Sequence, residues 1–209
     1  MKITRVTPIH CDGGWRAFTF VKVETDAGVT GYGECTDGRS AYGLAGCIRD
    51  LEPALVGQDP LAIEKLYWDM RRAQRHHVGG TALQAIAGID IALWDVKGKA
   101  LGLPVYKLLG GPIRTEVRVY WSHCGTYRAR EQYRVHMGTP PIRTYDDIRR
   151  LGEEVVKRGY TALKTNMVVP GNPSRVLAPE DGNITNEILE LTVKNIAAFR
   201  EAVGPKVDI

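Results

Sequence analysis

The sequence has few of the features that mark secreted or membrane-bound proteins. Only four of its 209 residues are cysteines, and none of them forms the CxxC spacing of a zinc or redox site. We therefore expect reduced, buried thiols in a cytoplasmic protein. No apolar run approaches the roughly 20 residues that cross a bilayer, so we expect no membrane association. The first residues alternate like a strand and lack the apolar core of a signal peptide.

An excess of charge of one sign is also missing. The 28 basic and 24 acidic residues leave a formal net charge of only +4, and the charges are scattered. The sequence contains no basic run with interleaved aromatic residues, which argues against nucleic acid as a partner. A composition that is 44% hydrophobic and 25% charged is ordinary for a folded protein.

The first third of the chain reads as antiparallel strands followed by helices. Alternating apolar residues predict strands at 3–10, 17–25 and 29–35, with a turn at 26–28. Asp59 before Pro60 predicts a helix that starts there. Residues 81–101 predict a second helix, with large apolar residues on one face and Ala85, Gly88 and Ala92 on the other. A helix of this kind is expected to lie between two layers.

After residue 112 the pattern changes to strands alternating with helices. We expect strands at 117–123, 161–168 and from 207, with helices at 145–158 and 184–203. The second of these helices is expected to bury Leu189, Val193, Ile196 and Val203. Strand, helix, strand, helix, strand is the order of a parallel α/β unit. A closed (β/α)₈ barrel typically needs about 250 residues, so these units would form only part of one.

Three stretches carry a resemblance to a known family. They are 30–34 (Thr-Gly-Tyr-Gly-Glu), the run 86–111 that ends in Leu-Leu-Gly-Gly, and the triplet 164–166 (Lys-Thr-Asn). Together they resemble the enolase superfamily, and more closely the mandelate racemase/muconate lactonizing enzyme family. The resemblance implies an α+β N-terminal capping domain over residues 1–112. It also implies that residues 113–209 are the first two βα units and the start of the third strand of an incomplete TIM-type barrel.

The resemblance implies a cofactor as well. The family binds Mg²⁺ through carboxylates at the ends of the third, fourth and fifth barrel strands, where the metal holds the substrate carboxylate. For this chain those ligands are expected downstream of Ile209, so we assign no metal ligand within it. We expect a fragment of a longer enzyme that forms a homo-oligomer at full length. Completion of the barrel by a partner chain remains an alternative.

Lys164 and Asn166 are the leading candidates for chemistry. They lie two residues apart in an expected strand, so their side chains should project from the same face. Lys164 matches the first lysine of the family's Lys-x-Lys motif, which neutralises an enolic intermediate, and is our candidate catalytic residue. Asn166 replaces the second lysine. It cannot serve as a base, but it can hydrogen-bond a substrate. This pattern resembles galactonate-dehydratase-type acid-sugar dehydratases.

Other positions are candidates for substrate binding. Ser122, at the end of the first barrel strand, matches a family serine near the substrate carboxylate, whereas His123 beside it is expected to be structural. Trp15 and Arg39 fall where the family's two specificity loops close over the site. Arg128, Arg130 and Arg134, with Tyr127 and Tyr133, lie in a long polar insert that is either a substrate-contacting lid or a solvated loop.

The expected activity is that of an acid-sugar (aldonic or aldaric acid) dehydratase. It would remove the proton α to a carboxylate with the help of Mg²⁺ and then eliminate water from the β position. One alternative is a racemase or epimerase of a 2-hydroxy acid on the same fold. Another is a non-catalytic fragment or partner-completed half enzyme. We expect the 209-residue chain by itself to be inactive.

Overall fold

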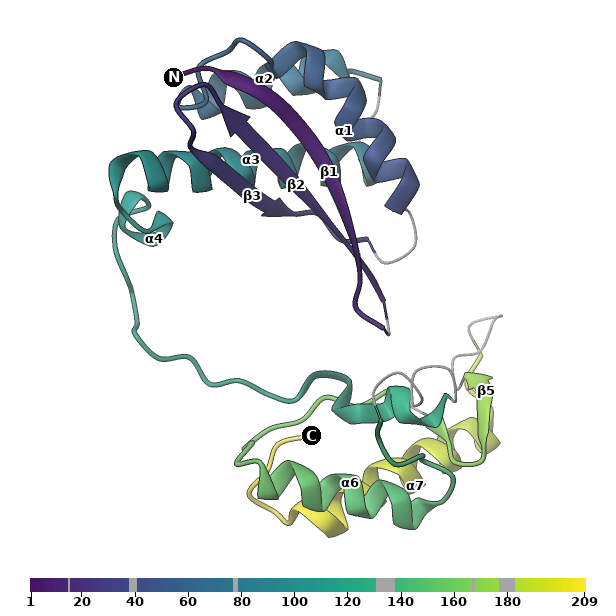
Figure 1. Cartoon of the computed structure of the whole chain (residues 1–209). Helices are drawn as coiled ribbons and strands as arrows, with labels where there is room; N and C mark the ends of the chain where they lie inside the picture. The colour runs from purple at the N-terminus through teal and green to yellow at the C-terminus, as the bar shows by residue number, and fades with distance from the viewer. Residues whose placement is uncertain (15, 38–40, 77–78, 131–137, 167, 177–182) are drawn as a thin grey trace. The chain divides into compact units, whose positions relative to one another are not determined.

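The computed structural model describes residues 1–14, 16–37, 41–76, 79–130, 138–166, 168–176 and 183–209. The chain forms two compact units, Met1–Thr115 and Glu116–Ile209 (Figure 1). The candidate substrate contacts Trp15 and Arg39 lie outside the described residues. Within the described parts, every helix is too short or too polar to cross a membrane.

The first unit is built on a three-stranded antiparallel sheet in the order β1-β2-β3. The strands are β1 (Ile3–Asp12), β2 (Ala17–Thr25) and β3 (Thr30–Glu34), which confirms the three predicted strands to within two residues at each end. The turn between β2 and β3 contains Gly28 at φ 75°, a left-handed conformation that suits glycine. Val21 and Val23 are fully buried, so alternate residues of β2 face the core.

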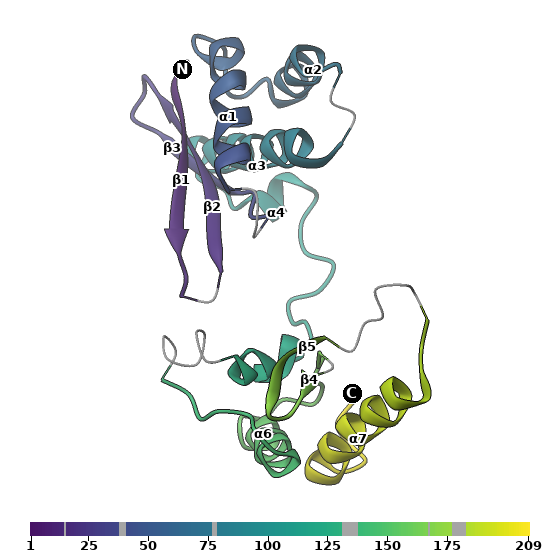
Figure 2. The same ribbon diagram turned by 90° about the vertical axis from the view of Figure 1, so that its right-hand side faces the viewer.

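Helices cover the face of the sheet to which those valines point. They are α1 (Ala41–Leu55), α2 (Ile63–Ala73), α3 (Gly80–Leu101) and the short α4 (Val105–Leu108). Figure 2 shows α1, α2 and α3 on the same side of the sheet. Helix α1 was not predicted from the sequence. The predicted start of α2 was wrong by three residues, because the Asp59 carboxylate accepts a hydrogen bond from the Leu61 amide at 2.9 Å and forms a turn before the helix.

Helix α3 packs against the sheet and also against helices α1 and α2, as predicted from its two unlike faces. A Cβ atom at Gly33 of β3 would lie 2.0 Å from the carbonyl oxygen of Gly88, and one at Gly31 would lie 2.1 Å from that of Ala92. The strand and the helix therefore approach so closely that only glycine fits at these two positions. Gly102 ends α3 at φ 65°, as predicted.

The second unit contains three short parallel segments. Trp121 pairs with Leu163, and Ala162 pairs with Asp208, so the middle segment lies between the other two. Helices α6 (Tyr145–Lys157) and α7 (Asn186–Val203) confirm the two predicted helices. A 3₁₀ segment, η1 (Ser122–Ala129), follows the first parallel segment, and β4 (Val168–Val169) pairs with β5 (Asn172–Val176) after the second.

Parts of the prediction for this unit were wrong. The expected strand at 161–168 pairs with the neighbouring parallel segments only at Ala162 and Leu163. The expected strand at 117–123 pairs only at Trp121, because the chain turns into η1 at the next residue. In α7, Leu189 and Val193 are more than half exposed, although they were expected to be buried. The buried face of α7 is formed by Asn195, Ala198, Phe199 and Val203, which is rotated from the predicted stripe. Asn195 reaches the core because its side-chain amide donates to the Leu191 carbonyl at 2.8 Å.

Candidate active site

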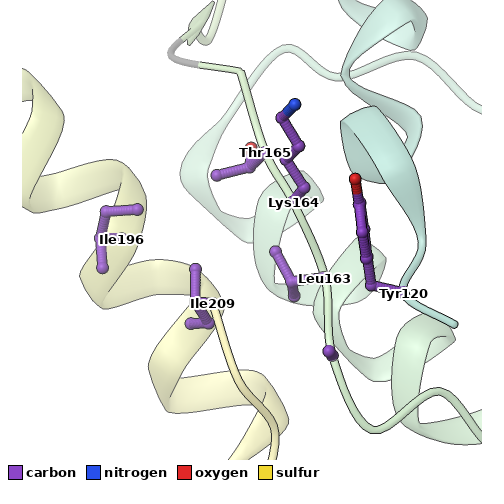
Figure 3. A pocket seen from close by; sticks show the side chains of 7 residues that line it. Tyr120, Leu163, Lys164, Thr165, Ile196 and Ile209 are labelled. Carbon is purple, nitrogen blue, oxygen red and sulfur yellow. The ribbon is translucent and has the colours of Figure 1, made fainter. Parts of the chain in front are cut away.

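The side chains of the middle parallel segment divide between two faces. Leu163 is only 4% exposed and packs in a core with Val155, Phe199 and Val207 from the helices and the third segment. Alternation along an extended segment then places Lys164 on the opposite face, where its side chain is exposed. Figure 3 shows Lys164 on the side of Tyr120, with Leu163 on the side of Ile196 and Ile209. Lys164 therefore lies on the face of the segment opposite the buried Leu163, which we call the inner face.

The three parallel segments are in register at this point. The Lys164 amide donates to the Trp121 carbonyl at 3.0 Å, and the Leu163 amide donates to the Asp208 carbonyl at 2.9 Å. A cavity of about 420 Å³ lies beside the middle segment. It is lined by Tyr120, Ala162, Leu163, Lys164, Thr165, Ile196 and Ile209. Its walls are mainly apolar and include Ile196 of α7 and the buried Leu163, whereas the Lys164 side chain is exposed.

The end of the first segment has an unusual backbone. Ser122 is exposed and begins η1, and the next three residues all have positive φ. The φ angles are 57° at His123, 37° at Cys124 and 66° at Gly125. Non-glycine residues in this region cost about 1–3 kcal/mol each and persist only where the surroundings hold them. The Thr126 hydroxyl donates to the His123 carbonyl at 2.7 Å and helps to fix the turn.

This turn brings His123 to Asn166. Nδ1 of His123 lies 2.9 Å from Nδ2 of Asn166, across the ends of the two neighbouring segments. From the sequence, a structural role was expected for His123, on the assumption that it would face away from Ser122 along a regular strand. That assumption was wrong because η1 breaks the alternation. No pattern in the sequence signals a left-handed turn at a histidine, although Gly125 two residues later is compatible with one.

Arg128 is not available to a substrate. It is only 7% exposed, and its guanidinium holds the Glu154 carboxylate of α6 through two bonds of 2.6 and 3.2 Å. It also lies 5.7 Å from the ring centre of Trp121. Hydrogen bonds from Arg128 and Arg158 hold the pKa of Glu154 below its usual value, although partial burial opposes the shift. The pair therefore anchors the start of the long insert to α6. Tyr133 and Arg134 lie outside the described residues.

Cys124, the cysteine of the second unit, is not a reactive nucleophile. Cys124 is fully buried, and burial raises the pKa of its thiol to about 12, an effect that Arg128 only partly offsets. The thiol is therefore protonated at neutral pH and behaves as a small apolar group. All four cysteines are free, as predicted. Cys35 and Cys124 are buried and Cys47 is partly buried, but the prediction of a buried thiol was wrong for Cys11, which is exposed.

The residues present do not form a site for Mg²⁺. Among those that the structure describes, no group of three or more His, Cys, Asp or Glu side chains could hold a metal ion. Asp208, the carboxylate nearest to the expected ligands along the chain, is paired with Arg118 at 2.6 Å.

The comparisons with known proteins place the chain in a family. Residues 6–110 match the profile of the mandelate racemase / muconate lactonizing enzyme N-terminal domain. The chain belongs to this family of the enolase superfamily. Its fold is accordingly an α+β capping domain followed by the first βα units of a TIM-type barrel.

Within this family, the chain is similar to the D-galactonate dehydratase of Verminephrobacter eiseniae, at 45% identity over 210 residues. That match includes all of this chain and 47% of the relative, so the chain spans about half the length of the curated relatives it matches.

Solved structures support the same family assignment. A protein from Burkholderia xenovorans, provisionally named an L-alanine-DL-glutamate epimerase and bound to magnesium and fumarate, matches 99% of this chain and 53% of its own with 32% identity and a TM-score of 0.86. A member of the enolase superfamily from Salmonella Typhimurium matches 100% and 53% at 33% identity, with a TM-score of 0.84.

Proposed function

We propose that the complete protein is an acid-sugar dehydratase, a hydro-lyase that acts on an aldonic or aldaric acid. The single observation that carries the proposal is Lys164, a cation on the inner face of the parallel segments, in a chain 45% identical to a D-galactonate dehydratase. The reaction would remove the proton α to the carboxylate and expel the β hydroxyl as water. The resulting enol would then rearrange to a 2-keto-3-deoxy acid.

Lys164 would supply positive charge where negative charge develops. Loss of the α proton spreads an electron pair onto the carboxylate oxygens, and a cation fixed beside them lowers the energy of that state. The Lys164 side chain is exposed, so a bound substrate would have to displace the water around its charge. We therefore assign to Lys164 a catalytic role that is electrostatic.

Asn166 and Ser122 would bind the substrate. Both are exposed at the ends of neighbouring parallel segments, and both offer hydrogen-bonding groups that suit hydroxyls or a carboxylate. An asparagine at position 166 cannot accept a proton at neutral pH, which favours a dehydratase over a racemase that needs a base there. Trp15 and Arg39 would contact the substrate from the capping domain.

Mg²⁺, when bound, would supply a Lewis acid for the substrate carboxylate. Side chains other than those described would have to hold it, since these contain no suitable cluster. We also propose that the complete protein is a cytoplasmic homo-oligomer and that the 209-residue chain is inactive by itself.

An epimerase is the second candidate, supported by the similarity to the Burkholderia xenovorans protein. The two reactions share α-proton removal and differ in the fate of the resulting enol. A dehydratase gives a 2-keto-3-deoxy product, whereas an epimerase returns the proton and gives only inversion.

The test is an assay of the complete gene product against a panel of aldonic and aldaric acids. The proposal predicts the release of a 2-keto-3-deoxy acid from at least one of them. Exchange of the α proton with solvent deuterium, without loss of water, would instead support the epimerase. Turnover of a hydrophobic 2-hydroxy acid and of no sugar acid would remove the assignment.

A further inference from the structure

We propose that His123 is a positioning residue that fixes the orientation of the Asn166 carboxamide beside Lys164. Asn166 would then accept a hydrogen bond from a substrate hydroxyl, while Lys164 takes the substrate carboxylate. This inference rests on the proposed function for its catalytic meaning. The pairing of the two side chains is a property of the protein alone and can be tested without substrate.

The chemistry of the contact sets the orientation of the amide. Nδ2 of Asn166 carries two hydrogens and no acceptor, so it donates to Nδ1 of His123 across the 2.9 Å contact. The contact therefore requires Nδ1 of His123 to act as the acceptor. The opposite end of the carboxamide, Oδ1, points away from His123. An oxygen acceptor selects a hydroxyl and disfavours a carboxylate, which is a distinction that suits a polyhydroxy acid.

The position of the His123 side chain depends on a backbone conformation that is unfavourable for residues other than glycine. His123 and Cys124 are the only described non-glycine residues with positive φ. The core holds the turn in place, because Cys124 is fully buried and Gly125 packs against Leu151. A Cβ at Gly125 would meet that leucine at 3.0 Å. The left-handed turn thus directs the His123 side chain across to the neighbouring segment.

Two substitutions separate the hydrogen bond from the backbone. His123→Gly tolerates the positive φ and removes the acceptor. His123→Asn also tolerates it and places an oxygen acceptor where Nδ1 stands in histidine. Cys124→Ala serves as the control within the same turn, since it removes buried volume and leaves both partners of the contact in place.

The first measurement is NMR spectroscopy of the substrate-free chain labelled with ¹⁵N. A scalar coupling between Nδ2 of Asn166 and Nδ1 of His123 is expected in the wild type and in Cys124→Ala. In His123→Gly the Asn166 amide protons should exchange faster with water, and in His123→Asn their protection should return. Absence of the coupling, or unchanged exchange in His123→Gly, would overturn the pairing whatever the protein catalyses.

The second measurement is steady-state kinetics of the complete protein with its best acid sugar. His123→Gly should lower kcat/KM by about 10- to 100-fold, a range typical of a misplaced binding group. His123→Asn should restore it to within a few-fold of wild type, and Asn166→Ala should add no further loss to His123→Gly. Cys124→Ala should lower Tm and leave kcat/KM within about twofold of wild type. Independent, additive losses from His123→Gly and Asn166→Ala would contradict the positioning role.

Discussion

In the second unit, two neighbouring residues have different roles. Leu163 packs into the core with the helices, and Lys164, the next residue, faces the other way. One face of this short segment therefore packs in the core, and the other carries the Lys164 ammonium group. The local anchors of this unit are the Arg128–Glu154 pair and the cap of α6, and both give predictions at this scale.

Thr144 begins α6 with a reciprocal cap. Its hydroxyl accepts from the Asp147 amide at 3.2 Å, while the Asp147 carboxylate accepts from the Thr144 amide at 2.8 Å. Thr144→Ala should lower the free energy of unfolding by about 1 kcal/mol. Urea unfolding followed by circular dichroism measures the change. Thr144→Ser keeps the hydroxyl and should lose much less, so equal losses in the two variants would show that the cap contributes nothing.

Glu154 should make the stability sensitive to acid. Its pKa is lower in the folded protein than in the unfolded chain, where about 4.3 is usual, so its contribution is fully present above that value. The contribution is lost as the pH falls through the lowered, folded pKa. Glu154→Gln should cost about 3 kcal/mol at pH 7, since it leaves the buried Arg128 without a counter-charge. Urea unfolding between pH 7 and pH 3 should show a shallower loss for this variant than for wild type, and parallel losses would contradict the assignment.

At the scale of elements, the contact between β3 and α3 depends on glycine. Gly33→Ala would place a methyl group 2.0 Å from the Gly88 carbonyl oxygen, so strand and helix must separate. We expect a loss of about 3 kcal/mol or more in the stability of the first unit. Gly46→Ala is the matched control. It lies within α1 with no atom near the new methyl group, and should stabilise the helix by about 0.5–1 kcal/mol. Thermal unfolding of both variants measures the difference, and similar Tm values would contradict the close packing.

The sequence predicted the positions of most strands and helices more accurately than it predicted which face of each helix is buried. Period-two alternation predicted β1, β2 and β3, and the two unlike faces of α3 predicted that it packs against both the sheet and other helices. The buried face of α7 was mispredicted because Leu189 and Val193 look as apolar as its core residues. Hydrophobicity alone cannot say which of two apolar stripes faces the helix's neighbours.

The candidate site was predictable in part for a similar reason. Alternation along an extended segment predicts that Lys164 and Asn166 share a face, and the structure places Lys164 on the face opposite Leu163. Alternation failed for His123, because the three left-handed residues of its turn depend on contacts with a core assembled from distant parts of the chain. Such a turn has no periodic signature in the sequence.

At the scale of the whole molecule, the proposed activity requires metal ligands that the described residues do not supply. The chain spans about half the length of its curated relatives, and its described residues hold no metal cluster. We therefore predict no dehydration of any acid sugar by the 209-residue chain, even with added Mg²⁺, and turnover by the complete gene product. Turnover by the short chain at a rate similar to that of the complete protein would contradict this prediction.

Lys164 should determine the rate of the proposed reaction, and replacing it with an uncharged side chain of similar length measures its contribution. The complete protein and its Lys164→Met variant would be assayed with the acid sugar that the wild type dehydrates best. Removing a fixed cation that stabilises developing charge should lower kcat/KM by about 10²- to 10³-fold. The far-ultraviolet circular dichroism should stay unchanged, and Lys157→Met, which removes an exposed lysine of α6, should keep full activity. Dehydration by Lys164→Met at close to the wild-type rate would contradict the account.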